Sequence, residues 1–195
     1  MRILKNILIY ALPALMLCNT SCDYLDKEPE NKVPEENVDF TQIENMYQAV
    51  SGVYAKVRTG GMHWVIWPLS VVRDDDVWSG RIDDQATLID MGNYNYDSSF
   101  WGLNEMWNQY YGINAALESL DSYAENITSD DDMTNYRSYC GEVRFLRAYA
   151  YYRLVQAFGP VTILRSNTQT DMTRSTINAV YKYVLEDLQY TMDHT

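Results

Sequence analysis

The sequence has few of the side chains that catalytic and metal sites use most often. It contains 3 cysteines and 2 histidines among its 195 residues. His63 falls in an expected loop and His194 lies next to the last residue, so neither is well placed as a general base. The sequence also has no Gly-rich phosphate loop after a strand, no nucleophile elbow and no Cys/His metal spacing. We therefore expect neither a cofactor nor a metal, and we assign no catalytic residue.

Cysteine and positive charge are both scarce, and each scarcity excludes a class of structure or partner. Once Cys18 and Cys22 of the N-terminal segment are set aside, Cys140 alone remains, and no intrachain disulfide can form. Cys140 lies on an apolar helical stripe, where we expect a small buried hydrophobe. The chain carries 15 Lys and Arg against 27 Asp and Glu, a net charge of −12. This balance argues against nucleic acid or an anionic membrane face as a partner.

The N-terminal residues have the pattern of a targeting segment. Arg2 and Lys5 give a positive start, and residues 7–18 form an apolar run too short to span a bilayer, which takes about 20 apolar residues. Small residues then precede Cys22, as in a lipoprotein signal whose cysteine is acylated. We predict a lipoprotein signal peptide over residues 1–22 with acylated Cys22, and an ordinary secretory signal is the alternative. Residues 23–40 follow as an acidic, proline-containing tether.

Hydrophobic periodicity predicts helices separated by polar segments, and hence an all-α fold. The first helix covers residues 41–58, with Thr41 as its N-cap and Glu44 completing a capping box. The second helix covers residues 100–123, and residues 125–134 form an acidic connector after it.

The last helix is expected to begin at residues 174–176, with Ser175 or Thr173 as its N-cap. Three- and four-residue spacing predicts its buried face, which comprises Ile177, Val180, Tyr181, Val184, Leu188 and Met192.

The helix that ends at Phe158 is the element around which we expect the others to pack. Its main apolar stripe begins at Tyr136, and a second stripe that includes Phe145 and Tyr152 lies on roughly the opposite side. A helix that is apolar on two faces needs partners on both, so we expect it inside a stack of helices. Gly159-Pro160 ends the helix, and residues 161–164 follow as a short extended run.

Two polar residues fall on apolar faces, and we assign both a structural role. Arg147 lies within the main stripe of the central helix, and a charge there must be paired. We therefore predict a salt bridge from Arg147 to a carboxylate of a neighbouring helix. Asn114 lies on the apolar face of the second helix, where we expect a buried hydrogen bond to backbone.

The segment of residues 59–99 is irregular, although residues 68–77 are compatible with a helix. It is too long for a loop that only joins two helices. It concentrates aromatic and hydrogen-bonding side chains, as sugar sites do: the apolar face of a pyranose packs on an aromatic ring, and Arg, Asn and Asp bond the hydroxyls. The alternative is that the Trp residues only anchor the loop to the helices. The glycan-binding candidates are Trp67, Arg73, Trp78, Arg81, Tyr94, Tyr96 and Trp101.

Three consecutive acids, Asp74, Asp75 and Asp76, lie in the same segment. A calcium loop needs oxygens at alternate positions, usually with a Gly turn and a closing Glu, and this run lacks that spacing. We interpret it as a solvated acidic loop.

Several stretches together resemble a known family. The central helix carries E-x-R-F-L-R-A-Y-x-Y-Y-x-L-V over residues 142–155, closed by F-G-P-V over residues 158–161. The second helix carries W-x-x-Y-x-x-I-N ending at Asn114, and residues 22–29 read CDYLDKEP. These patterns resemble the SusD/RagB family of surface nutrient-binding lipoproteins of Bacteroidetes-type bacteria.

The resemblance implies tetratricopeptide-like helical repeats in a right-handed superhelix, with a long irregular loop region that contributes to a glycan site. Because family members are far longer, residues 41–195 are expected to be the N-terminal portion of a larger SusD-like fold, truncated at the C-terminus. It further implies a non-enzymatic lipoprotein, lipid-anchored and surface-exposed at the outer membrane. Such a protein binds oligosaccharides, or peptides, and delivers them to a SusC-like TonB-dependent transporter.

Two other classes of function remain open on the sequence alone. A carbohydrate-active hydrolase would use two carboxylates, which abound here, although no pair is singled out by an apolar setting. A structural helical adaptor at the cell surface would need no ligand. Glycan binding without turnover favours the binding protein, release of reducing ends favours the hydrolase, and absence of glycan affinity favours the adaptor.

Overall fold

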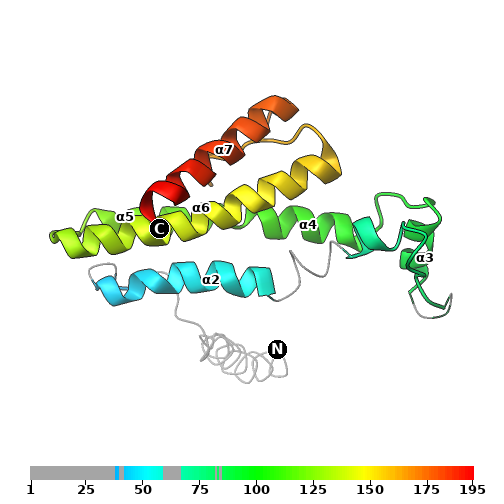
Figure 1. Cartoon of the computed structure of the whole chain (residues 1–195), viewed down its shortest axis with the longest axis horizontal. Coiled ribbons are helices and arrows are strands. Elements are labelled where there is room, and N and C mark those ends of the chain that lie inside the picture. The colour runs from blue at the N-terminus through cyan, green and yellow to red at the C-terminus, as the bar shows by residue number, and fades with distance from the viewer. Residues whose placement is uncertain (1–37, 40–41, 59–66, 82, 84) are drawn as a thin grey trace, which may run out of the picture. The chain divides into compact units, whose positions relative to one another are not determined.

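The computed structural model describes residues 38–39, 42–58, 67–81, 83 and 85–195 (Figure 1). The chain divides into two units, Met1–Val38 and Asp39–Thr195, and the helices below belong to the second. The predicted signal peptide with Cys22, almost all of the predicted tether, and the predicted Thr41 cap lie outside the described residues.

Helices dominate the described part of the chain, as the sequence predicts. In chain order they are η3 (Ile43–Asn45), α2 (Met46–Arg58), the π-helical turn η4 (Trp67–Val71), α3 (Ala86–Gly92), α4 (Trp101–Tyr111), α5 (Asn114–Ala124), α6 (Asp130–Phe158) and α7 (Ile177–His194). The extended pairing found among these residues is a single antiparallel bridge between Val161 and Ser175. The all-α fold class is therefore confirmed. In the described part of the chain, no helix has the length and apolar character needed to cross a membrane.

The 29-residue helix α6 is the element against which the others pack. It contacts α2, α4, α5 and α7, and Figure 1 shows it running between α7 on one side and α2 on the other. This helix begins earlier than the sequence predicts, because the segment expected to be a connector is helical from Asp130 onward. The Ser129 hydroxyl accepts a hydrogen bond from the Asp132 amide at 3.0 Å, and the acidic first turn suits the positive end of the helix dipole.

The two apolar faces of α6 are buried to different degrees. Most of the main stripe is deeply buried, as its spacing predicts: Cys140, Val143, Leu146, Ala150 and Leu154. Its outer members, Tyr136, Tyr139 and Phe158, are half-buried. The second stripe is only half covered, because Ala148 and Val155 are buried while the rings of Phe145 and Tyr152 stay exposed. Burial also raises the pKa of the Cys140 thiol to about 11, as expected for a small buried hydrophobe that is not a reactive cysteine.

The helix predicted over residues 100–123 is in fact two helices, α4 and α5. The break falls at Gly112 and Ile113, and the Lys56 ammonium of α2 donates to the Gly112 carbonyl at 2.8 Å. Glycine is a weak helix former, and the lysine supplies a partner for a carbonyl that would otherwise bond within the helix. The single-helix prediction was wrong because this partner comes from another element.

The start and the buried face of α7 also differ from the prediction. Its N-cap is Thr176, whose hydroxyl accepts from the Ala179 amide at 3.3 Å. Neither Ser175 nor Thr173 caps it, because the Ser175 amide donates to the Val161 carbonyl instead. Val180 and Val184 are buried as predicted, whereas three other residues of the predicted face are exposed: Ile177, Tyr181 and Met192.

The side of α7 that is buried is rotated toward Tyr183 and Asp187. This rotation follows from the antiparallel packing of α7 on α6, where Asp187 bonds Arg147 and Thr191 bonds the Gly141 carbonyl. A Cβ at Gly141 would lie 2.7 Å from the Thr195 methyl, so the missing side chain lets the two helices approach closely.

Candidate functional site

The candidate residues lie between η4 and α4, and the end of α3 sets their positions. The helix finishes in a Schellman motif, in which the Asn95 amide donates to the Asp90 carbonyl at 2.8 Å and the Tyr94 amide to Met91 at 3.2 Å. Tyr94 occupies the left-handed position with φ 57°, where glycine is the usual residue. A tyrosine there costs about 1–2 kcal/mol, which points to a use for its side chain.

That side chain belongs to a cluster of Arg73, Tyr94 and Tyr96, which we call the Arg73 cluster. The Tyr94 hydroxyl donates to the Arg73 carbonyl at 3.2 Å, and the Arg73 guanidinium lies 5.7 Å from the centre of the Tyr94 ring. Arg73 Nη1 also donates to the Tyr96 hydroxyl at 3.4 Å. Both rings remain exposed, Tyr94 to 66%. The structure thus brings together three of the seven predicted glycan-binding residues.

A cavity of about 580 Å³ opens beside this cluster, and we call it the Arg73 cleft. Its walls come from three parts of the chain, with Leu69, Ser70, Arg73 and Tyr96 from the loop, Leu103 and Met106 from α4, and Arg153, Gln156, Ala157 and Phe158 from α6. The volume lies in the range of small-ligand sites, roughly 300–1,000 Å³. The lining combines apolar side chains with a few polar groups that face the same cavity.

Trp78 and Arg81 form a separate surface, which we call the Trp78 platform. The indole is 82% exposed, and it borders a second hollow together with Gly80, Arg81, Asp83 and Ile89. Gly80 has φ 92°, a turn conformation that suits glycine. Arg81 donates from Nε and Nη2 to the two carboxylate oxygens of Asp83 at 2.8 and 2.7 Å. This fork geometry fixes the direction of both polar groups next to the exposed ring.

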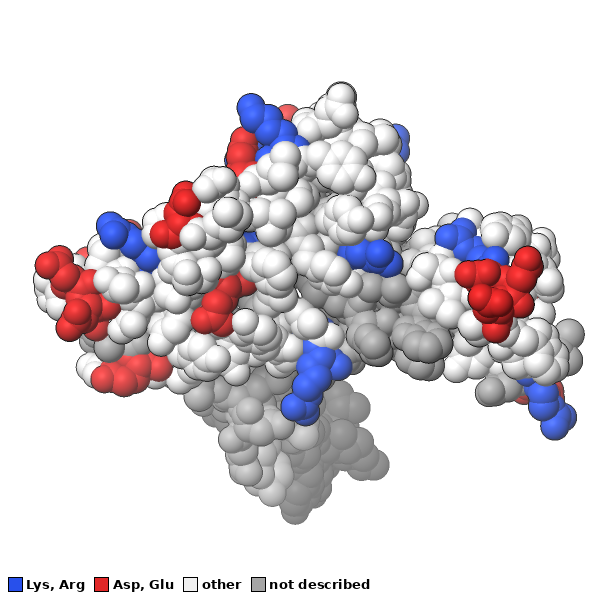
Figure 2. All heavy atoms as spheres, viewed as in Figure 1, with Lys and Arg blue, Asp and Glu red and all other residues white. Residues whose placement is uncertain are grey.

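Of the two remaining candidates, Trp101 can be placed, and it joins neither surface. Trp101 is half-buried, and its ring lies 5.5 Å from that of Phe100, which is the packing role of the alternative interpretation. The side chain of Trp67 lies outside the described residues. Asp74, Asp75 and Asp76 are exposed in a turn, where Asp74 accepts a hydrogen bond from the Asp75 amide. Figure 2 shows acidic side chains gathered over this η4–α3 region.

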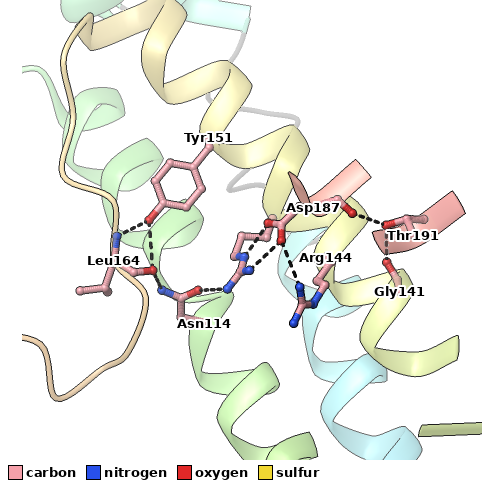
Figure 3. Close-up of polar contacts among 8 residues, drawn as sticks. Asn114, Gly141, Arg144, Tyr151, Leu164, Asp187 and Thr191 are labelled. Carbon is pink, nitrogen blue, oxygen red and sulfur yellow. Dashed lines mark hydrogen bonds and ion pairs between the residues drawn. The ribbon is translucent and has the colours of Figure 1, made fainter. Parts of the chain in front are cut away.

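The polar residues assigned a structural role lie elsewhere, in a buried network between α5, α6 and α7 (Figure 3). Arg147 Nε and Nη2 donate to the two carboxylate oxygens of Asp187 at 2.8 and 2.7 Å. Burial by itself lowers the pKa of Arg147, but the hydrogen bonds and charge of Asp187 outweigh it, so the pKa lies above its ordinary value. Arg147 therefore has the interhelical carboxylate partner that the sequence predicts.

The network continues through Asn114 to the chain that follows α6. Arg147 Nη1 donates to the Asn114 side-chain oxygen at 3.0 Å, and the Asn114 amide donates to the Leu164 carbonyl, the backbone bond expected for this residue. The Leu164 amide in turn donates to the Tyr151 hydroxyl at 2.7 Å. Arg144 lies 3.8 Å from Asp187 and stacks over Tyr190. Arg147, Asn114 and Asp187 are each bonded to other protein groups, which supports a structural role for Arg147 and Asn114.

Sequence reasoning missed the wall that α6 contributes to the Arg73 cleft. Arg153, Gln156 and Phe158 lie in the last two turns of the helix, at a spacing that places them near one another. The stop signal at Gly159 marks the point where the helix end meets a loop. It is the one sequence signal that places these three residues near a possible site. Asp187 was missed as well, because nothing local distinguishes it from the other acids of α7.

Comparisons with known proteins give a consistent set of matches. A SusD-like family model, described as "Starch-binding associating with outer membrane", matches residues 23–194. The SusD-like protein P2 of Formosa agariphila is 24% identical over 187 residues, covering 92% of this chain and 36% of that protein. A SusD-like protein of Bacteroides ovatus is 22% identical over 203 residues, covering 97% of this chain and 35% of that protein. The chain thus spans about a third of the length of these relatives.

Solved structures share the fold. A SusD homolog from Bacteroides thetaiotaomicron superimposes with a TM-score of 0.65 at 22% identity, over 83% of this chain and 33% of the other. A structure with a bound xylogluco-oligosaccharide gives 0.63 at 18% identity, over 77% and 30%. A laminarin-binding SusD-like protein gives 0.56 at 20% identity, over 79% and 34%. These likenesses agree with the tetratricopeptide-like helical fold expected from the sequence.

Proposed function

This chain belongs to the SusD-like family, and from that premise we propose that it is a surface-exposed, glycan-binding lipoprotein of the outer membrane. The observation that carries the proposal is the Trp78 platform. An indole that is 82% exposed next to a fixed Arg81–Asp83 pair offers an apolar stacking face and directed hydrogen-bonding groups side by side. A pyranose presents the matching surfaces, a C–H face and a rim of hydroxyls.

The relatives support a carbohydrate ligand. One structure of the same fold contains a xylogluco-oligosaccharide and another is a laminarin-binding protein, so we infer that the ligand of this chain is also an oligosaccharide. Under this proposal the Trp78 ring stacks on one sugar, and Arg81 and Asp83 exchange hydrogen bonds with its hydroxyls. The Arg73 cluster and its cleft extend the contact to further sugars.

Replacing Trp78 by alanine is expected to weaken oligosaccharide binding by at least about tenfold, because the stacking face is lost. Titration calorimetry with laminarin- and xyloglucan-derived oligosaccharides measures the effect. Trp78→Phe keeps a ring and should lose less affinity than alanine. Tyr181→Ala removes an exposed ring of α7, away from the loop, and should bind as the parent does. Equal affinity of the Trp78→Ala variant and the parent would show that the platform is not a sugar site.

We further propose that the protein is anchored by a lipid on Cys22, the residue that follows the small side chains at the end of the signal segment. Metabolic labelling with palmitate should therefore label the protein, and Cys22→Ala should abolish the label. Cys18→Ala is the matched control, because this neighbouring cysteine follows a large Leu and should not be the processing site. If the label persists in Cys22→Ala but disappears in Cys18→Ala, the lipid is attached to Cys18 and not to Cys22.

The proposed role of the bound glycan is transport. The protein would pass it to a SusC-like TonB-dependent transporter in the same membrane. Purification of the tagged protein from outer membranes of its source bacterium in mild detergent is expected to retain such a transporter, identified by mass. Recovery of the protein without a transporter would leave a free-standing glycan-binding protein or an adaptor.

Binding without turnover separates this proposal from a hydrolase. Incubation with the oligosaccharides that bind should release no new reducing ends. Release that is lost when a single carboxylate is replaced would instead assign the protein to the hydrolases.

A further inference from the structure

The Arg73 cleft gathers positive charge in a strongly acidic protein. The chain has a net charge of −12, yet Arg73 and Arg153 both line this one cavity. No Asp or Glu is found among the described residues of its lining. Two arginines that share a cavity without a facing carboxylate repel each other, and an anion would relieve that repulsion.

The arginines at two other sites face carboxylates. A cavity of about 230 Å³ beside the buried network is lined by Arg144, Arg147 and Arg165, and also by Glu118, Glu186 and Asp187. On the Trp78 platform, Arg81 is held by Asp83. These sites are balanced within the protein. The Arg73 cleft differs from them in leaving its positive charge unbalanced by the described residues around it.

The two guanidiniums also keep donors available. Arg73 Nη1 makes a long bond of 3.4 Å to the Tyr96 hydroxyl, and Arg153 Nη1 bonds the Gln156 side-chain oxygen at 3.1 Å. Both of these acceptors are uncharged. Arg153 Nε is buried, and the Arg153 side chain also interacts with the buried Tyr110 hydroxyl, which is likewise uncharged.

Guanidinium groups bind planar or multi-oxygen anions through paired N–H donors. Beside them, Phe158 and Leu103 supply an apolar surface for the carbon face of a sugar ring, and Gln156 and Ser70 supply groups for hydroxyls. A neutral sugar uses the second set of groups but not the unbalanced charge. A sugar that carries a carboxylate or sulfate uses both.

We propose that the Arg73 cleft is a subsite for an acidic sugar, so that the ligand of this protein is an anionic oligosaccharide bound through Arg73 and Arg153. The proposal rests on the proposed glycan-binding function and names the class of its ligand. Arg153 is thereby a specificity-determining residue on the central helix, opposite the loop that carries Arg73.

Titration calorimetry on the full chain with matched probes tests the proposal. The anionic probes are tetragalacturonate and a heparin-derived tetrasaccharide, which separate carboxylate from sulfate as the recognised group. The neutral probes are methyl-esterified tetragalacturonate, which has the same backbone without the charge, and laminaritetraose. We expect at least one anionic probe to bind about tenfold tighter than the neutral ones. Its affinity should fall as NaCl rises from about 0.05 M to about 0.5 M.

Three variants locate the effect. Arg73→Gln and Arg153→Gln should each weaken the anionic probe by about tenfold, while Arg153→Lys, which keeps the charge, should weaken it less. Arg137→Gln is the matched control, because it removes an exposed arginine from the same helix near its other end. Circular dichroism of each variant verifies that the helices are intact.

The outcomes separate the two proposals. Neutral probes that bind as tightly as anionic ones, or anionic binding that is unchanged in both glutamine variants, would overturn the acidic subsite and leave glycan binding intact. Absence of binding to every probe, neutral and anionic, would overturn the glycan-binding function itself and the subsite with it.

Discussion

Replacing Asp187 by alanine is expected to lower the free energy of unfolding by about 3–5 kcal/mol, because it leaves Arg147 as an uncompensated buried charge. Both side chains are almost fully buried, at 8% and 2% exposure, and two short hydrogen bonds join them. The substitution also removes the carboxylate that lies 3.8 Å from Arg144. A loss of this size is a large part of the total stability of an ordinary domain, about 5–15 kcal/mol.

Urea denaturation followed by circular dichroism measures the loss. Asp193→Ala is the control, because Asp193 is an exposed acid on the same helix whose one bond, to Gln189, is solvent-accessible. Its effect should be within about 0.5 kcal/mol. The double variant Arg147→Met with Asp187→Leu removes both charges and should recover most of the stability. A double variant as unstable as Asp187→Ala would show that burial of an unpaired charge is not the cause.

Replacing Tyr151 by alanine is expected to cost about 3–5 kcal/mol, the usual range for removing a large buried aromatic side chain. Tyr151 is 1% exposed, and its ring packs edge-on against Tyr111 and Tyr183 at 5.8 and 5.1 Å between centroids. Its hydroxyl also accepts the Leu164 amide hydrogen at 2.7 Å. Burial raises the pKa of this phenol above its ordinary range, so it stays protonated at physiological pH.

Tyr151→Phe separates the two contributions, because it keeps the ring and leaves the Leu164 amide without its partner. We expect it to cost about 1–3 kcal/mol. Tyr149→Ala on the same helix removes a ring that is partly exposed and should cost less than Tyr151→Ala. Thermal and urea unfolding of the three variants measure their stabilities and rank them. A Tyr149→Ala variant as unstable as Tyr151→Ala would mean that α6 is not buried on the side that the structure shows.

The parts of the fold that depend on local signals could be predicted. The end of α6 follows from Gly159-Pro160, and Gly159 has the positive φ of 68° that a glycine stop allows. The burial of the main α6 stripe follows from its spacing. The break between α4 and α5 could not be predicted in the same way, because the lysine that bonds Gly112 lies 56 residues away in the sequence. The cap of α7 was misplaced for a similar reason, since the Ser175 backbone pairs with Val161.

The sequence predicted which region of the chain holds the candidate site, but not how its side chains are arranged in space. Composition identified the loop, and the loop does hold the Arg73 cluster and the Trp78 platform. Composition could not tell that Arg73 and Trp78 belong to different surfaces, because Arg73 is bonded to Tyr94 and Tyr96, 21 and 23 residues later, whereas Trp78 lies beside Arg81 and Asp83. The sequence also could not assign Arg153 to the cleft. Helical periodicity identifies the apolar faces of α6 that pack in the core, and it does not show which polar residue of that helix lies beside the loop. Which side chains meet across the cleft depends on tertiary packing, and no local pattern encodes it.

The buried Arg147–Asp187 pair also sets an order of events when the chain folds. Asp187 lies 40 residues after Arg147, so a growing chain contains the arginine long before its partner. The turns of α6 can form early, because their backbone bonds are local. The face that carries Arg147 cannot be buried against α5 at that stage without an unpaired charge. We therefore expect nascent α6 to keep this face in water until α7 has been synthesised.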